Sequence, residues 1–513
     1  MNNFEKLVAL LEGNLARDEF AELEEAMRHD PTLRQEWIRL QSLEGELEQR
    51  FSGSTATAQR QSHPPGHLLA LAAVFAVSAL LIALFLLARE PASTYAPADL
   101  SGLEPVAIIS AIEEVKWQKG EQASLSVGSL VKPGVLMLES GKVKLDFFCG
   151  AAVVLAGPAE LQVLSEKRAF LLHGKAAATV PLAAVGFTIR TPDAAVVDLG
   201  TEFAVAVDKQ GESFVHVYDG EVRVSLLGDD GATRSSSPVT TGDSLQVQPK
   251  AARLTPTLLK GNEYLPAPPP FGLDGLQVPD SYREMVLNAQ PVGYWTFDAD
   301  LKNEASDSWT VEAVGPGVSL YRGAVLFEQV AGEISCLRST ELLPQIEDSN
   351  YTIGMWVKPA SIHYATLAAI CTDQFVDRSS PHHLSVIELM HNSHLIHPPN
   401  SIRFLNRWEE DEVNVFSSRP FVPGKWHHIV AVKDEEHSAI YLNGHLVTQA
   451  KVTSQPDDQR FRLVFGQIDH LRSKRQLHGL MDEVAFYLRA LSEEEIAMQF
   501  ETMAAANPLL FNY

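Results

Sequence analysis

The chain has 513 residues, of which 65 are acidic and 41 basic, so its formal net charge is -24 at pH 7. A chain of this length is too long for a single hydrophobic core, and we expect two or three folded units. The acidic excess argues against a nucleic-acid partner, because affinity for nucleic acids comes mainly from lysine and arginine side chains that neutralise phosphates.

The N-terminal region, residues 1–50, has the apolar spacing of three amphipathic helices. Its apolar positions are Phe4, Leu7, Val8 and Leu11, then Phe20, Leu23 and Met27, then Leu33, Trp37, Leu40, Leu43 and Leu47. Asp30 and Pro31 suit the start of the third helix, as an N-cap followed by proline at the first helical position. Because so small a region buries little apolar surface, we expect a loose helical hairpin or a core that a partner completes.

Within this region, LLEGNLARDEFAELEEAMRHDPTLRQEW (Leu10 to Trp37) resembles the cytoplasmic N-terminal segment of membrane anti-sigma factors. The resemblance implies that residues 1–50 bind a sigma factor and keep it from RNA polymerase. Many members of that family bind zinc through a histidine and paired cysteines. This segment contains no cysteine, which excludes the zinc-binding version. The alternative is a soluble helical head without a sigma-factor partner.

Residues 67–88, HLLALAAVFAVSALLIALFLLA, contain no Asp, Glu, Lys or Arg. As a helix this segment would be about 33 Å long, and the hydrocarbon core of a bilayer is about 30 Å thick. We therefore expect a transmembrane helix. A signal peptide would be shorter and nearer the N-terminus, and a core helix of a soluble protein seldom has so long an apolar run. Residues 51–66 and 89–105 are predicted to be linkers on its two sides.

The charges beside this segment indicate its orientation only slightly, with Arg50 and Arg60 before it and Arg89 after it. The positive-inside rule gives a small preference for a cytoplasmic N-terminus. The β-rich modules that follow look extracytoplasmic. We therefore expect a bacterial protein that crosses the inner (cytoplasmic) membrane once, with its C-terminal domains in the periplasm or otherwise outside the cytoplasm.

From residue 106 to residue 248 the apolar pattern changes to period two, in short runs separated by turn residues, which predicts an all-β domain. Gly141, Gly174, Gly220 and Gly242 lie between these runs, where turns often need positive φ. The segment Thr191 to Phe203, T-P-x-A-x-V-x-D-L-G-T-E-F, and the runs around it resemble the FecR domain. The resemblance implies an extracytoplasmic β domain of a transmembrane regulator, which conveys an outside signal to a sigma factor inside.

Three carboxylates of this segment, Asp193, Asp198 and Glu202, have spacing short enough to suggest acid–base chemistry. Asp198 and Glu202 are separated by Leu-Gly-Thr, which is typical of a turn between two strands. A turn carboxylate usually caps a backbone amide. We therefore favour a structural role for these residues.

Residues 249–280 are predicted to form a proline-rich, extended linker. After it, residues 281–513 resemble the LamG, or concanavalin A-like, jelly roll. The segments that carry this resemblance are PVGYWTFD, YTIGMWVKP, GKWHHIVAVKD, AIYLNGHLV and GLMDEVAFYLRALSEEEI. Asn443-Gly444 predicts a hairpin turn, and Ser492 with Glu495 predicts a capping box at the start of a short helix.

Jelly rolls of this kind include glucanases, lectins and adhesion modules, so the fold does not decide the function. Laminarinase-type glucanases carry E-x-D-x-E on one strand, which places their carboxylates on one face. The nearest segment here is DEVAF, and its adjacent carboxylates, Asp482 and Glu483, should point to opposite faces of a strand. We therefore expect no enzymatic activity.

Calcium is the cofactor that the resemblance implies, because related jelly rolls often bind it through aspartates and backbone carbonyls. By position alone, the candidate ligands are Asp298, Asp300, Asp307 and Asp482. The alternative is that Asp298 and Asp482 cap turns.

The cysteines and histidines form no close-spaced metal pattern. If the jelly roll lies outside the cytoplasm, Cys336 and Cys371 could pair as a disulfide and leave Cys149 as a buried thiol. Three unpaired core cysteines are the alternative. His391 and His394 lack a suitably spaced Cys or carboxylate, so we expect exposed loop histidines rather than a zinc site.

Taken in order, the sequence predicts a mostly β, multidomain protein: a small α-helical region, one transmembrane helix, a FecR-like all-β domain and a LamG-like β-sandwich. The hypothesis is a single-pass signalling regulator of FecR or anti-sigma-factor type. Residues 1–50 would bind a sigma factor, and residues 281–513 would bind an extracellular glycan or protein. The first alternative is a membrane-anchored adhesin or scaffold without a regulatory role, and a carbohydrate-active enzyme comes third.

Overall fold

The computed structural model describes residues 104–118, 125–181, 184–228, 231–248, 253–257, 274–330, 333–342, 350–372, 383–391, 398–408, 411–452, 460–468 and 475–511. The predicted helices of residues 1–50 and the segment 67–88 lie outside these ranges. Within them, no helix is long and apolar enough to cross a membrane. The transmembrane helix at 67–88 therefore stays a prediction. The described residues are mostly β strand, as expected.

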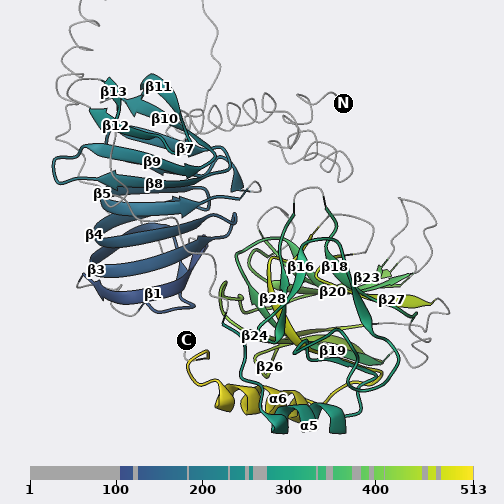
Figure 1. Ribbon diagram of the computed structural model, residues 1–513. Helices are drawn as coiled ribbons and strands as arrows, with labels where there is room; N and C mark the ends of the chain where they lie inside the picture. Colours follow the sequence, from purple (N-terminus) through teal and green to yellow (C-terminus); the bar gives the residue numbers. More distant parts are fainter. Residues whose placement is uncertain are drawn as a thin grey trace, which may run out of the picture. The chain divides into compact units, whose positions relative to one another are not determined.

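The first β domain is a 13-stranded sheet, drawn in blue to teal in Figure 1. Its strands are β1 (Ala107–Trp117), β2 (Leu130–Val131), β3 (Gly134–Phe147), β4 (Ala152–Ser165), β5 (Arg168–Thr179), β6 (Thr188–Arg190), β7 (Ala194–Asp198), β8 (Glu202–Val207), β9 (Ser213–Asp219), β10 (Glu221–Leu227), β11 (Thr233–Thr240), β12 (Ser244–Gln248) and β13 (Arg253–Pro256). The period-two runs of the sequence fall in β3 to β10 and β12, because alternate side chains of a strand face one core. Strand β13 lies within residues 249–280, which the sequence predicts to be a linker.

The sheet divides at β5. One branch continues through β6, β7, β10 and β11, with β5 and β6 parallel, and the other continues through β8, β9, β12 and β13. Fully buried side chains of both branches, such as Val196 of β7 and Val205 of β8, belong to the same hydrophobic cluster. The apolar faces of the two branches therefore enclose a common core.

Gly220 and Gly174 illustrate two uses of positive φ. Gly220, with φ of 87°, lies in the turn between β9 and β10, as expected. Gly174, with φ of 104°, lies inside β5 rather than between strands, where the pairing with β4 shifts register between Ala156 and Glu160. This bulge depends on the partner strand, so the sequence of β5 does not reveal it.

Gly174→Ala is expected to lower the free energy of unfolding of this domain by about 2 kcal/mol or more. The added methyl would lie 2.4 Å from Cβ of Ala159, in addition to the strain of positive φ. Gly242→Ala is the matched control, because Gly242 has φ of 85° and nothing within 4 Å of the added atom. Hydrogen exchange of the β5 amides measures the free energy of unfolding of both variants. Equal losses of this free energy would contradict the clash at Gly174.

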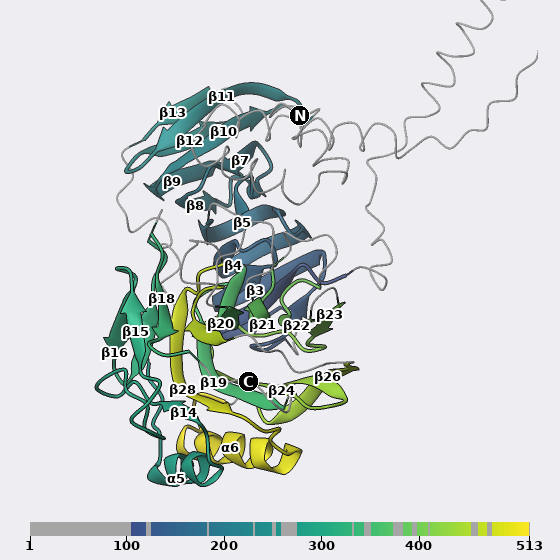
Figure 2. The ribbon, with the colours of Figure 1, turned by 90° about the vertical axis from the view of Figure 1, so that its right-hand side faces the viewer.

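The second β domain is a sandwich of two antiparallel sheets, drawn in green to yellow in Figure 2. The order of the first sheet is β16-β17-β28-β19-β24-β25-β26, with β14 paired to β28, and that of the second is β15-β18-β27-β20-β21-β22-β23. The strands are β14 (Gly293–Trp295), β15 (Val311–Val314), β16 (Val318–Tyr321), β17 (Ala324–Phe327), β18 (Cys336–Ser339), β19 (Tyr351–Pro359), β20 (Ala365–Thr372), β21 (His383–Leu389), β22 (Ile402–Trp408), β23 (Asp411–Phe416), β24 (His427–Lys433), β25 (His437–Leu442), β26 (His445–Lys451), β27 (Phe461–Phe465) and β28 (Gly479–Tyr487).

Two helices, α5 (Asp280–Asn288) and α6 (Glu493–Ala506), cover the outer face of the first sheet (Figures 1 and 2). The capping box of α6 is confirmed, since the Ser492 hydroxyl accepts from the Glu495 amide and the Glu495 carboxylate accepts from the Ser492 amide. The hairpin at Asn443-Gly444 is also confirmed, with φ of 51° and 79° between β25 and β26. Both features depend on a few neighbouring residues.

Candidate functional site

Helix α5 rests on the first sheet through aromatic side chains. Tyr282 and Val286, one turn apart on α5, are buried against this face. The indole nitrogen of Trp356, on β19, donates a 2.9 Å hydrogen bond to the Tyr282 hydroxyl. Trp356 in turn stacks on His428 of β24, with ring centroids 4.8 Å apart. These contacts hold α5 against the sheet, and Arg283 is the next residue of α5 after Tyr282.

A bulge in β28 places two carboxylates beneath α5. Gly354 pairs with Ala485 and Trp356 pairs with Asp482, so β28 has one more residue than β19 between these pairs. The bulge is at Glu483, whose φ is 49°. Met481 and Val484 both face the core between the sheets, which leaves Asp482 and Glu483 toward the other face. The expectation that these carboxylates point to opposite faces is therefore wrong.

Arg283 is the cation that faces these groups. Its Nη2 lies 2.5 Å from Oδ2 of Asp298 and 3.5 Å from Oε1 of Glu483. The Tyr294 hydroxyl donates to Oε2 of Glu483, and Oδ1 of Asp482 accepts the Glu483 amide at 2.8 Å. Asp482 and Glu483 are each 1% exposed. Three carboxylates thus share one guanidinium, two of them out of contact with water.

Burial raises the pKa of Asp482 well above its ordinary value, and the charge of Glu483 raises it further. Burial also raises the pKa of Glu483, although the hydrogen bond from Tyr294 and the charge of Arg283 act in the opposite direction. Two adjacent buried carboxyls cannot both ionise cheaply beside a single cation. The pair therefore retains a proton at neutral pH.

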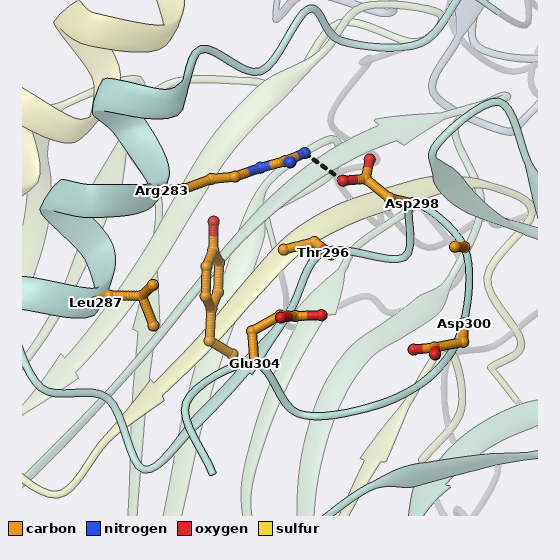
Figure 3. Close-up of a pocket in the computed structure, with 8 residues that line it drawn as sticks. Arg283, Leu287, Thr296, Asp298, Asp300 and Glu304 are labelled. Carbon is orange, nitrogen blue, oxygen red and sulfur yellow. Dashed lines mark ion pairs between the residues drawn. The ribbon is translucent and has the colours of Figure 1, made fainter. Parts of the chain in front are cut away.

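Beside this cluster lies an open pocket of about 200 Å³. Figure 3 shows Arg283 and Leu287 of α5 on one side, and Thr296, Asp298, Asp300 and Glu304 from the loop after β14 around the rest. The dashed line in the figure is the ion pair between Arg283 and Asp298. The pocket therefore presents a guanidinium, three carboxylates and the hydroxyls of Tyr294 and Thr296 around a space open to solvent.

The structure places two of the four candidate calcium ligands at the pocket. Asp298 and Asp300 line the pocket, and Asp482 lies beneath it, whereas Asp307 is exposed on the surface and does not line the pocket. Asp298 pairs with Arg283, and Asp300 pairs with Lys302 at 3.0 Å. In the part of the chain that the structure describes, no three His, Cys, Asp or Glu side chains are grouped to hold a metal ion. Calcium binding stays a prediction.

In the first β domain, Asp198 behaves as a turn cap. Its Oδ2 accepts the Gly200 amide at 2.8 Å, and burial raises its pKa to about 7. The side chain is fully buried, whereas Asp193 and Glu202 are partly exposed. This arrangement agrees with the structural role expected for Asp198.

The cysteines are three free, buried thiols, so the Cys336–Cys371 disulfide does not form. Cys336 is on β18 and Cys371 is on β20, and β27 lies between these strands. Leu337 of β18 and Ala368 of β20 both pair with Phe465 of β27. Cys371 therefore lies about four residues from Cys336 along the strand direction. That separation, about 13 Å along the strand at about 3.3 Å per residue, far exceeds the reach of a disulfide.

The histidines are more buried than expected. His391 is 8% exposed and lies edge-on to Tyr364. His427 and His428 are buried in β24, within the segment GKWHHIVAVKD. Burial lowers the pKa of His427 to about 4 and that of His428 to about 3. His394 lies outside the described residues. The two histidines of β24 are therefore neutral at physiological pH.

A second buried charge cluster lies on the second sheet, and no pattern in the sequence predicts it. Glu388 of β21 is fully buried and accepts from Nη1 of Arg403 at 3.0 Å and from Nη1 of Arg475 at 2.7 Å. The Arg475 guanidinium also stacks on the Tyr364 ring, 4.5 Å from its centroid. These residues are far apart in sequence and carry no local motif, so only the folded sheet brings them together.

Comparison with known proteins identifies both β domains. Residues 140–223 match the FecR protein family. Residues 337–497 match the concanavalin A-like lectin/glucanases superfamily, as Laminin_G_3. After these matches we call the two β domains the FecR domain and the LamG domain. No curated protein matches the sequence.

Several solved structures are similar to part of the chain at low identity. Domain 4 of AbnA, a GH43 extracellular arabinanase from Geobacillus stearothermophilus, in complex with arabinotriose, is 16% identical, with a TM-score of 0.32 over 41% of this chain and 98% of that one. The binding domain of Paraclostridial Mosquitocidal Protein 1 is also 16% identical, with a TM-score of 0.31 over 42% of this chain and 52% of that one. The chain thus spans about half the length of that toxin domain.

Proposed function

We propose that the protein is a single-pass transmembrane signalling regulator of FecR or anti-sigma-factor type, whose LamG domain binds a glycan or protein outside the cytoplasm. The observation that carries the proposal is the FecR domain, which follows a charge-free apolar segment at residues 67–88. The anti-sigma-like sequence at Leu10 to Trp37 supports the inward partner. The LamG domain supports an outward ligand.

The division of labour follows from this order of modules. An outside ligand would bind the LamG domain, the FecR domain would transmit its occupancy, and residues 1–50 would hold or release a sigma factor.

Capture of the tagged full-length chain from bacterial membranes tests the proposal. We expect a sigma factor to co-purify with it, because the sequence of residues 1–50 predicts apolar helical faces that are too small to form a core alone. Leu23→Asp places a charge on a predicted apolar face and should abolish capture. Glu25→Asp, a conservative change outside the predicted apolar positions, is the control.

Recovery of the intact chain without any sigma factor, from cells that express one, would contradict the regulator. Such a result, with ligand binding by the LamG domain retained, would favour the membrane-anchored adhesin or scaffold.

A further inference from the structure

The Thr296 hydroxyl lies at the pocket beside α5. Thr296 is 8% exposed and lines the pocket. Among the residues that the structure describes, its hydroxyl has no hydrogen-bond partner, and it is not one of the buried side-chain atoms that lack one. The hydroxyl is therefore open to the pocket, where water or a ligand can hydrogen-bond to it. Thr296 therefore offers a donor and an acceptor to a molecule in the pocket.

The other groups around Thr296 suit a polyhydroxylated molecule. The carboxylates of Asp298, Asp300 and Glu304 accept hydrogen bonds, and Arg283 donates them. Leu287 adds an apolar wall (Figure 3). A site that combines several hydrogen-bonding groups with an apolar surface matches a sugar ring, which carries hydroxyls at its rim and C–H groups on its faces. The volume, about that of six or seven water molecules, is enough for one ring.

The charges of the pocket select among sugars. Asp298 is paired with Arg283 and Asp300 with Lys302, and Glu304 is a third carboxylate beside these two cations, which leaves an excess of negative charge. An acidic sugar would bring a carboxylate toward these groups and be repelled. An amino group would be attracted, and a neutral sugar would be accepted.

We propose that this pocket binds a single neutral or amino-bearing sugar ring, with Thr296 and Glu304 as specificity-determining contacts. The inference rests on the glycan-binding role proposed for the LamG domain, and it assigns that role to the face covered by α5.

Calorimetry on the full-length chain in a sugar-free detergent tests the assignment, with glucose, glucosamine and glucuronate as probes. We expect glucosamine to bind best, glucose more weakly and glucuronate not at all. Thr296→Val removes the hydroxyl, and Glu304→Gln removes the charge without changing the shape. Each should weaken glucosamine binding by at least about threefold, the effect of one lost hydrogen bond.

Asp307→Asn is the control, because Asp307 is exposed in the same loop but does not line the pocket. It should leave binding unchanged, and thermal unfolding should show that all three variants fold. Absence of binding by every probe, equal binding of glucuronate, or unchanged affinity of both pocket variants would each overturn the assignment. The sigma-factor capture is independent of these results, so a failure of the regulator proposal is distinguishable from a failure of the pocket.

Discussion

Arg283→Met is expected to lower the free energy needed to open β28 by about 3 kcal/mol at pH 8. The substitution keeps the aliphatic stem but leaves Glu483 buried without its cation, next to Asp298 and Asp482. The loss should be smaller at pH 5, because Glu483 can then take up a proton and become neutral. Hydrogen exchange of amides in residues 479–487 measures this local free energy in the full-length chain.

Two further variants make this result specific. Glu483→Gln in the Arg283→Met background should restore part of the stability at pH 8, because the amide carries no charge to bury. Lys302→Met removes another cation that pairs with a carboxylate, but that pair is exposed, and little change is expected. A loss in Arg283→Met that is the same at pH 5 and pH 8, or that Glu483→Gln does not relieve, would contradict the buried-charge account.

Asp482→Asn is expected to make the LamG domain more stable at pH 8 and to flatten its dependence on pH. The pKa of Asp482 is raised in the folded domain, where the carboxyl stays protonated, whereas the unfolded chain releases this proton above a pH of about 4. The contribution of Asp482 to stability is therefore complete below that pH and declines by about 1.4 kcal/mol per pH unit until the folded-state pKa is reached. Asparagine has no proton to lose.

The geometry of the site favours this substitution. The side-chain oxygen at position 482 accepts the Glu483 amide, and the oxygen of an asparagine side chain can accept the same hydrogen bond without a charge. The other titratable or charged groups near the pair, Tyr282, Arg283, Tyr294 and Asp298, remain unchanged. Asp307→Asn, on the surface, should leave the slope as it is. An unaltered slope in Asp482→Asn, measured by the same exchange experiment between pH 5 and pH 8, would show that Asp482 is ionised in the folded domain.

Features that depend on neighbouring residues could be predicted from the sequence. The Asn443-Gly444 turn and the Ser492–Glu495 capping box are determined within a few residues, and both occur as expected. The period-two runs of the first β domain likewise predict most of its strands, but not β13, which lies in the segment predicted to be a linker.

The candidate site could not be predicted, because its geometry arises from pairing between distant segments. Asp482 and Glu483 share one face only because β28 bulges against β19, and positive φ at a glutamate has no signature in the sequence. Arg283 looks like an ordinary polar residue of a short helix, and its partner Glu483 is far along the chain. Two of the candidate calcium ligands, Asp298 and Asp300, do lie at the pocket but are engaged in ion pairs.

The regulator proposal is tested most directly by transcript profiling of cells with and without the protein. The account predicts a coordinated change in one group of genes whose promoters share a sigma-factor recognition sequence. The full-length chain should reverse this change, and a chain lacking residues 1–50 should not. Unchanged transcription of every such group, with the protein present in the membrane of the parent cells, would contradict the account.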